Sequence, residues 1–202
     1  RPGAFSTGGF LGLNESLLAV QEQDFRTLEG AQISAAQVAD ALEYILGSAM
    51  QQRDELLARR ESALARPTGT LKTALQLAMQ AAPQEDEFAR RDVHLPDLHA
   101  GQLHGFSLQD PPNPEKGYWV DGKWQVFFAP FRGVQDCPWG CPLHPWAYFD
   151  FLIFNRNSGE CLIGPGLIVH LIRAHQFFEG CESPYRVDPV RAIRVLELVS
   201  GS

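Results

Sequence analysis

The chain has 202 residues, of which 45% are hydrophobic and 20% charged, so it is not a disordered, collagen-like or low-complexity sequence. This length suits one domain or two small ones, and it can bury a core without help from a disulfide or a metal ion. The net charge of −7 excludes nucleic acid and anionic membrane as favoured partners, because both repel a negative protein. No run approaches the roughly 20 apolar residues of a membrane-spanning helix, so we expect a soluble, cytoplasmic protein.

Residues 1–92 have the pattern of a helical region. Asn14 can cap a first helix, whose apolar residues recur at roughly helical spacing. Ser34 and Gln37 form a capping box, which predicts that a second helix begins at this point. A shorter third helix over residues 71–81 is predicted to pack back against it.

Residues 93–202 are rich in strand patterns. Asp121-Gly122 between two aromatic segments predicts a hairpin with a two-residue type I′ turn, since both turn positions need a positive φ. That geometry would place Trp119 opposite Trp124. A second hairpin is predicted within residues 147–163, around a turn rich in Asn, Ser and Gly.

Two short helices are predicted to close the chain, the last beginning with Asp188 as its cap and Pro189 in its first position. The expected fold is therefore α+β: an N-terminal helical hairpin or bundle packs on a mainly antiparallel sheet, followed by two short C-terminal helices. The charged segment before residue 92 indicates a boundary between a helical region 1–92 and a strand-rich region 93–202. Whether these regions share one core stays open at this stage.

Several catalytic signatures are absent from the sequence: the phosphate-binding loop, the dinucleotide fingerprint, the nucleophile elbow and the His-Glu-x-x-His zinc helix. Residues that bind metals are instead concentrated in the last third, which holds all the cysteines. They are Cys137, Cys141, His144, Cys161, His170, His175 and Cys181.

The segment from Cys137 to Cys141 resembles the knuckle turn of zinc-binding domains, although three residues separate the cysteines instead of the usual two. His170 and His175 have four residues between them, which lies within the range of the second ligand pair of zinc fingers. We therefore predict one structural Zn²⁺ bound by Cys137, Cys141, His170 and His175, with His144 as a substitute ligand. Zinc is favoured because thiolate and imidazole ligands suit it.

Other interpretations of these residues remain. Positions five apart on a straight α-helix diverge by about 140°, so His170 and His175 would need a helix that unwinds or tightens at its end. If the two histidines do not bind a metal ion, His175 is a hydrogen-bonded core residue and His170 faces solvent. The cysteines can be buried thiols of a reducing compartment, or Cys137 and Cys141 can form a disulfide.

Asp150 interrupts an apolar strand pattern, where a carboxylate must find a partner or change its pKa. One interpretation is a structural hydrogen bond to a nearby backbone amide, tryptophan or arginine. The other is an acid–base or metal cluster with His144 and Glu179. The tryptophans, which all lie near this strand in the sequence, can line a binding groove or simply pack the sheet.

The first functional hypothesis is an interaction or regulatory protein that binds another protein. It rests on the acidic charge, the absence of strong catalytic signatures, the aromatic-rich sheet region and the exposed faces of the helical part. The alternative is a metal-dependent hydrolase that uses Asp150, His144 and Glu179 around an ion with an open coordination position.

Overall fold

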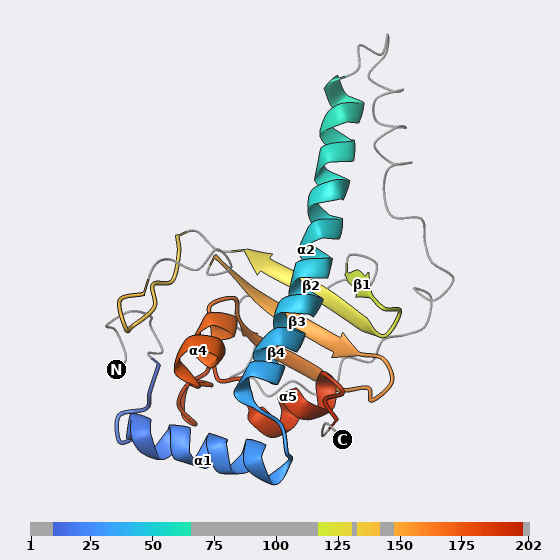
Figure 1. Ribbon diagram of the computed structural model, residues 1–202. Coiled ribbons are helices and arrows are strands. Elements are labelled where there is room, and N and C mark those ends of the chain that lie inside the picture. The colour runs from blue at the N-terminus through green and yellow to red at the C-terminus, as the bar shows by residue number, and fades with distance from the viewer. Residues whose placement is uncertain (1–9, 66–116, 131–132, 142–147, 200–202) are drawn as a thin grey trace.

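The computed structural model describes residues 10–65, 117–130, 133–141 and 148–199 (Figure 1). Over these residues it has four helices and one four-stranded antiparallel sheet, with two short helices after the sheet. The expected α+β class is therefore confirmed. The elements are α1 (Leu17–Gly30), α2 (Ala35–Ala65), β1 (Tyr118–Val120), β2 (Trp124–Pro130), β3 (Phe149–Asn155), β4 (Cys161–Pro165), α4 (Ile168–His175) and α5 (Pro189–Val195).

The sheet is a meander in which the strands follow one another in the order β1-β2-β3-β4, each antiparallel to the next. β3 is buried at every position. Its alternate residues point to opposite faces: Phe151 and Ile153 join the main core, whereas Leu152 and Phe154 join a second apolar cluster. The continuous apolar run in the sequence is thus explained by a strand that is covered on both faces.

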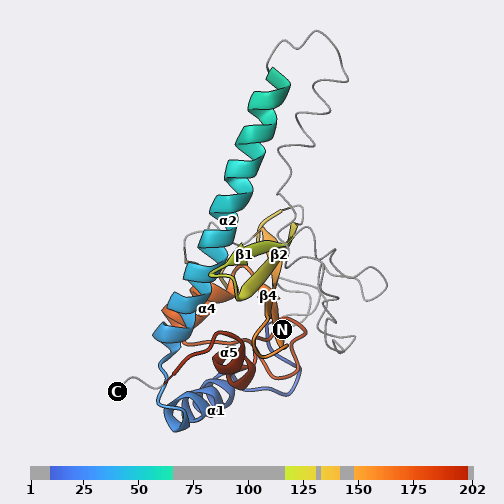
Figure 2. The same cartoon turned by 90° about the vertical axis from the view of Figure 1, so that its right-hand side faces the viewer.

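α2 begins at the predicted capping box. Ser34 N donates a hydrogen bond to Gln37 Oε1 at 2.8 Å, and Gln37 N donates to Ser34 Oγ at 3.2 Å. Val38, Leu42 and Ile45 recur at helical spacing and are fully buried in the main core. Figure 2 shows α2 and α4 on the same side of the sheet. The second half of α2 has no buried side chain among those described, and it projects beyond the sheet (Figure 1).

Two helix starts test the capping predictions. α1 has Ser16 as its N-cap, without a side-chain cap bond, so the prediction of Asn14 as the cap was wrong. α5 begins as predicted: Asp188 Oδ1 accepts a hydrogen bond from Arg191 N at 2.9 Å, and Pro189 follows in the first helical position.

The β1–β2 hairpin differs from the prediction by one residue. Its turn has the expected positive φ at Asp121 (51°) and Gly122 (66°). Lys123 is a third turn residue, and its carbonyl oxygen accepts a hydrogen bond from the β3–β4 turn. The strand register therefore moves by one residue and places Trp119 and Trp124 on opposite faces, so the predicted tryptophan pair is wrong.

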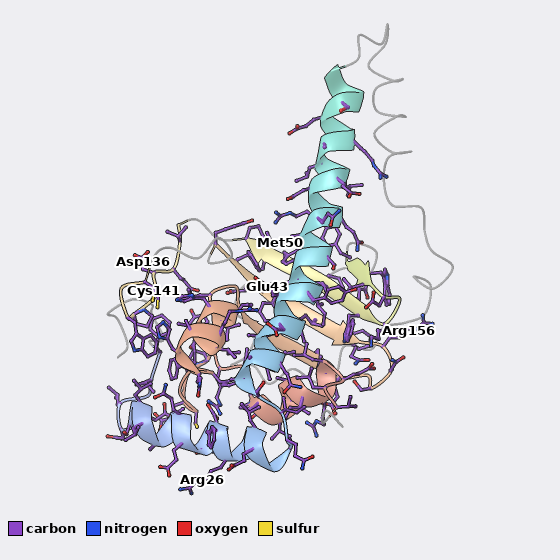
Figure 3. All side chains as sticks on the ribbon, viewed as in Figure 1. Arg26, Glu43, Met50, Asp136, Cys141 and Arg156 are labelled. Atoms are coloured by element: carbon purple, nitrogen blue, oxygen red, sulfur yellow. The ribbon has the colours of Figure 1, made fainter. Side chains whose placement is uncertain are left out.

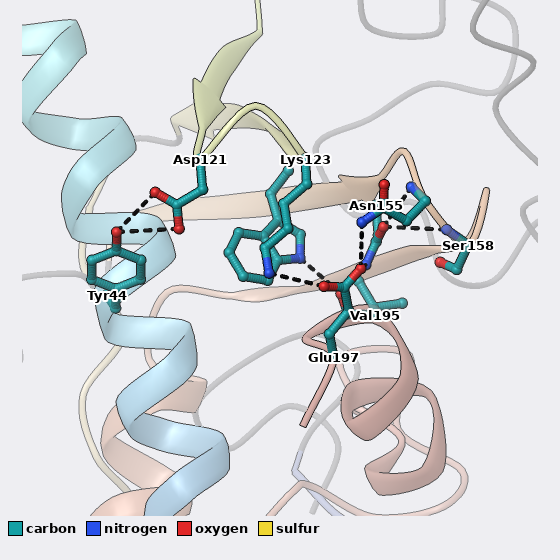
Figure 4. A network of polar contacts seen from close by, with 9 residues as sticks. Tyr44, Asp121, Lys123, Asn155, Ser158, Val195 and Glu197 are labelled. Carbon is teal, nitrogen blue, oxygen red and sulfur yellow. Dashed lines mark hydrogen bonds and ion pairs between the residues drawn. The ribbon is translucent and has the colours of Figure 1, made fainter. Parts of the chain in front are cut away.

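Polar contacts connect the turns of both hairpins to α2 and to the segment that follows α5 (Figure 4). The Tyr44 hydroxyl on α2 donates to the Asp121 carboxylate at 3.0 Å. Lys123 Nζ donates to Glu197 Oε2 at 2.8 Å, and Asn155 Nδ2 donates to Glu197 Oε1 at 3.1 Å. Hydrogen bonds lower the pKa of Glu197 to about 2, and the bond from Lys123 has the largest effect.

The main core draws buried side chains from α1, α2, the sheet, α4 and α5. The predicted boundary between residues 92 and 93 and the predicted helix over residues 71–81 both lie outside the described residues. Within the described part of the chain, no helix is both long and apolar enough to cross a membrane.

Candidate metal centre

A tight turn brings the two cysteines of the predicted knuckle close together. Gly140 N donates to the Cys137 carbonyl oxygen at 2.9 Å, which closes a β-turn with Pro138 in its second position. Gly140 follows with φ 72°, a conformation that glycine adopts without strain. The chain therefore reverses between Cys137 and Cys141, and both thiols can reach one point.

α4 supplies the two histidines. It is anchored by buried apolar residues, among them Leu171 and Ile172, and it ends at His175 before Gln176, which has the left-handed φ of 50°. The His170 and His175 rings lie 5.3 Å apart, centroid to centroid, in an edge-to-face arrangement. The expected divergence of these positions on a helix therefore does not keep the two rings apart, and the second of them stands at the last residue of α4.

The four predicted ligand residues form one group, in which a ligand atom from each side chain lies within 4.8 Å of all the others. His175 Nε2 is 3.3 Å from Cys137 Sγ and 3.4 Å from Cys141 Sγ. A tetrahedral Zn²⁺ with bonds of about 2.3 Å to sulfur and about 2.0 Å to nitrogen separates these atoms by about 3.5 Å. The spacing of the side chains therefore fits a metal ion with little rearrangement. Figure 3 shows Cys141 on the loop beside α4.

Burial shifts the pKa of three of these four groups. It lowers the pKa of His170, and burial together with the nearby charge of His170 lowers the pKa of His175. Burial also raises the pKa of Cys141, helped by a hydrogen bond with the Cys137 thiol. Both imidazoles are therefore neutral and ready to coordinate at neutral pH, whereas a metal ion would have to displace the proton of the Cys141 thiol.

Three residues that the sequence did not single out for the site support it. The Trp139 ring, carried by the knuckle turn, stacks on the His175 ring at 4.1 Å and 10°. Phe177 packs edge-on against Trp139 at 5.5 Å. Gln21 Nε2 on α1 donates to the His175 carbonyl oxygen at 2.7 Å. A cysteine spacing cannot indicate these contacts, because they depend on how α1 and α4 pack.

The carboxylates of the alternative catalytic hypothesis lie outside this group. Glu179 is 1% exposed, it accepts a hydrogen bond from Ser183 Oγ at 2.6 Å, and it feels the charge of Asp150. Burial raises the pKa of Glu179 to about 8, against the opposing effects of Ser183 and Arg186. Neither Asp150 nor Glu179 belongs to the Cys–His group, and His144 lies outside the described residues.

Comparisons with protein-family models, with curated proteins and with solved structures found no match. The fold and the site therefore define a class only: an α+β protein with a Cys₂His₂ group placed to hold a metal ion.

Proposed function

We propose that this chain is a protein-binding module stabilised by one structural Zn²⁺, which Cys137, Cys141, His170 and His175 coordinate. The observation that carries the proposal is the mutual approach of four ligand atoms within 4.8 Å. Two thiolates and two imidazoles in tetrahedral positions are the ligand set that zinc prefers.

A structural role follows from the number of ligands. Four protein ligands complete the tetrahedron and leave no position for a water molecule, which a hydrolytic zinc needs. The ion would join the knuckle to α4. The described loop of residues 133–141 contains only one buried side chain, Cys137, so apolar packing does little to fix this loop. A bound metal ion would fix the loop instead.

The hydrolase alternative requires an open coordination position with a carboxylate beside it. Because Asp150 and Glu179 lie outside the Cys–His group, no observation favours it over the structural role.

The projecting half of α2 supports a protein partner. It leaves the body of the molecule with exposed side chains along its length, including Leu57, which is 48% exposed. A partner helix or groove can cover such an apolar side chain. The net charge of −7 points away from nucleic acid as the partner.

Metal analysis tests the zinc site. Protein purified without a His tag or chelator is expected to contain about one zinc per chain, and Cys137→Ser or His175→Ala to lose it. Cys181→Ser is the matched control, because Cys181 is an exposed cysteine outside the group and should leave the zinc content unchanged. Less than about a tenth of an equivalent in the unaltered protein would falsify the site.

Affinity capture followed by mass spectrometry tests the protein partner. Leu57→Asp is expected to release a partner that the unaltered chain retains, whereas Ser62→Asp adds the same charge to an exposed position of the same helix and should retain it. If both variants retain every captured protein, the projecting helix is not the binding surface.

A further inference from the structure

The two cysteines of the candidate metal centre are also placed to react with each other. Cys137 Sγ and Cys141 Sγ contact the same nitrogen, His175 Nε2, at 3.3 Å and 3.4 Å. The two sulfur atoms lie within 4.8 Å of each other, and the two thiols share a hydrogen bond. The sulfurs of a disulfide are about 2.05 Å apart. A movement of less than about 3 Å therefore brings them to bonding distance.

The loop that carries the two cysteines can make this movement. The β-turn closed by Gly140 N and the Cys137 carbonyl oxygen brings the α-carbons at its two ends within about 7 Å. Disulfides join α-carbons that are about 4.4–6.8 Å apart, so the turn already approaches the required geometry. Only Cys137 is buried among residues 133–141, so little apolar packing resists the change. A disulfide can therefore form here without unfolding the rest of the molecule.

The other two cysteines of the chain lie outside this pair. Cys161 on β4 is 3% exposed and belongs to the second apolar cluster. Burial raises the pKa of Cys161 to about 11, and because the thiolate is the reactive form, this thiol is inert at neutral pH. Cys181 is exposed and is not a member of the Cys–His group. Cys137 and Cys141 are thus the thiols that the fold brings together for oxidation.

Zinc binding and disulfide formation at this pair exclude each other. A zinc ion holds both sulfurs as thiolates, whereas the sulfurs of a disulfide carry no negative charge. After oxidation, only the imidazoles of His170 and His175 would remain from the four ligands. A structural zinc site needs four protein ligands, so the oxidised chain would lose its ion.

We propose that hydrogen peroxide oxidises Cys137 and Cys141 to a disulfide and so releases the zinc ion, which makes the metal centre a redox switch. The inference rests on the zinc site of the proposed function. The disulfide would keep the turn closed, but no metal ion would then join this turn to α4. The contact affected is the one in which Trp139 stacks on His175 at 4.1 Å.

The reaction has two steps that together balance. Cys141 is the more exposed of the two cysteines and reacts first. Its thiolate sulfur attacks one oxygen of the peroxide, the O–O bond breaks, and the hydroxide that leaves takes up a proton to form water. The Cys137 thiolate then attacks the sulfur of the Cys141 sulfenic acid. The S–S bond forms, the S–O bond breaks, and a second hydroxide leaves and is protonated. The two sulfurs lose two electrons, the peroxide gains them, and Zn²⁺ leaves with its charge unchanged.

Treatment of the zinc-containing protein with hydrogen peroxide tests the proposal. A chromophoric zinc chelator measures the released ion, and mass spectrometry of alkylated peptides identifies the oxidised cysteines. We expect release of about one zinc per chain together with a disulfide between Cys137 and Cys141. Dithiothreitol followed by zinc should restore the original state. Cys181→Ser is the matched control, because it removes an exposed thiol outside the group and should release the same amount of zinc.

The experiment separates failure of the switch from failure of the zinc site. Protein that holds less than about a tenth of an equivalent of zinc before oxidation contradicts the proposed function, and the switch falls with it. Protein that holds zinc and still retains it after Cys181 has been oxidised contradicts the switch alone. The switch is also overturned if zinc leaves while Cys137 and Cys141 become sulfinic acids or join Cys161 or Cys181. Retention of zinc by Cys181→Ser would mean that oxidation begins at Cys181, which overturns it as well.

Discussion

Burial and hydrogen bonding change the pKa of the Glu179 carboxyl in opposite directions. Burial raises its pKa from 4.5 to about 8, the charge of Asp150 acts in the same sense, and Ser183 and Arg186 oppose both. The pKa of Tyr185 is raised by its own burial and then by the charges of Asp150 and Glu179. Burial therefore dominates, and an ionised Glu179 destabilises the folded state.

Glu179→Gln should stabilise the protein progressively as pH rises above about 4.5. The folded state binds the Glu179 proton up to about pH 8, whereas the unfolded state loses it near pH 4.5, so the unaltered chain loses stability as pH rises between these values. The variant cannot ionise. Its free energy of unfolding should match that of the unaltered chain below pH 4.5 and exceed it increasingly above that, by about 1.4 kcal/mol for each pH unit up to about pH 8.

Urea denaturation across this pH range measures the difference. Glu22→Gln is the matched control, because Glu22 is 58% exposed and pairs only with Arg26 on the helix surface among the described contacts. Its stability should follow that of the unaltered chain at every pH. If the free energy of unfolding of Glu179→Gln also followed that of the unaltered chain at every pH, burial of Glu179 would not raise its pKa.

The sequence alone was enough to predict which four residues form the candidate metal centre. The turn-forming residues between Cys137 and Cys141, and the spacing of His170 from His175, are local features, and the structure brings these four side chains together. That they bind zinc stays a prediction. The stacking of Trp139 on His175 was not predictable, because it depends on where the knuckle meets α4.

Among the elements, the two N-terminal helices offer a direct test of capping. Ser34→Ala removes the hydroxyl that accepts from Gln37 N at 3.2 Å, and it should lower the free energy of unfolding by about 1 kcal/mol. Ser16 is the N-cap of α1 but makes no side-chain cap bond, so Ser16→Ala should change stability by less than about 0.5 kcal/mol. Chemical denaturation measures both, and equal losses would show that capping does not explain the start of α2.

Capping boxes and turn residues were predictable because each is decided within a few neighbouring residues. The starts of α2 and α5 follow this rule. The register of the first hairpin was not predictable in this way. Lys123 is not paired with β1; its backbone bonds to the β3–β4 turn and its side chain pairs with Glu197. Those partners come from distant parts of the chain, so the local pattern indicated the turn but not the strand pairing.

For the whole molecule, the decisive feature is a core shared by both halves of the chain. Leu42 of α2 is fully buried in the same apolar cluster as Phe151 of the sheet and Leu171 of α4. Removing the N-terminal helices would expose to water the side chains of β1, β2 and α4 that pack against α2. We therefore expect the helices and the sheet to unfold together, and a fragment that begins at residue 93 not to fold alone.

Leu42→Ala should lower the stability of the whole molecule, because it leaves a cavity in the shared core that costs about 2–4 kcal/mol. Far-UV circular dichroism reports mainly on α1 and α2, the two longest described helices, and fluorescence reports on tryptophans that all lie in the second half. Both signals should therefore show one coincident transition that moves to lower denaturant. Leu57→Ala makes the same change at a side chain of the same helix that is 48% exposed, and should shift the transition little. Two domains would instead lose the helical signal first and leave the tryptophan signal in place.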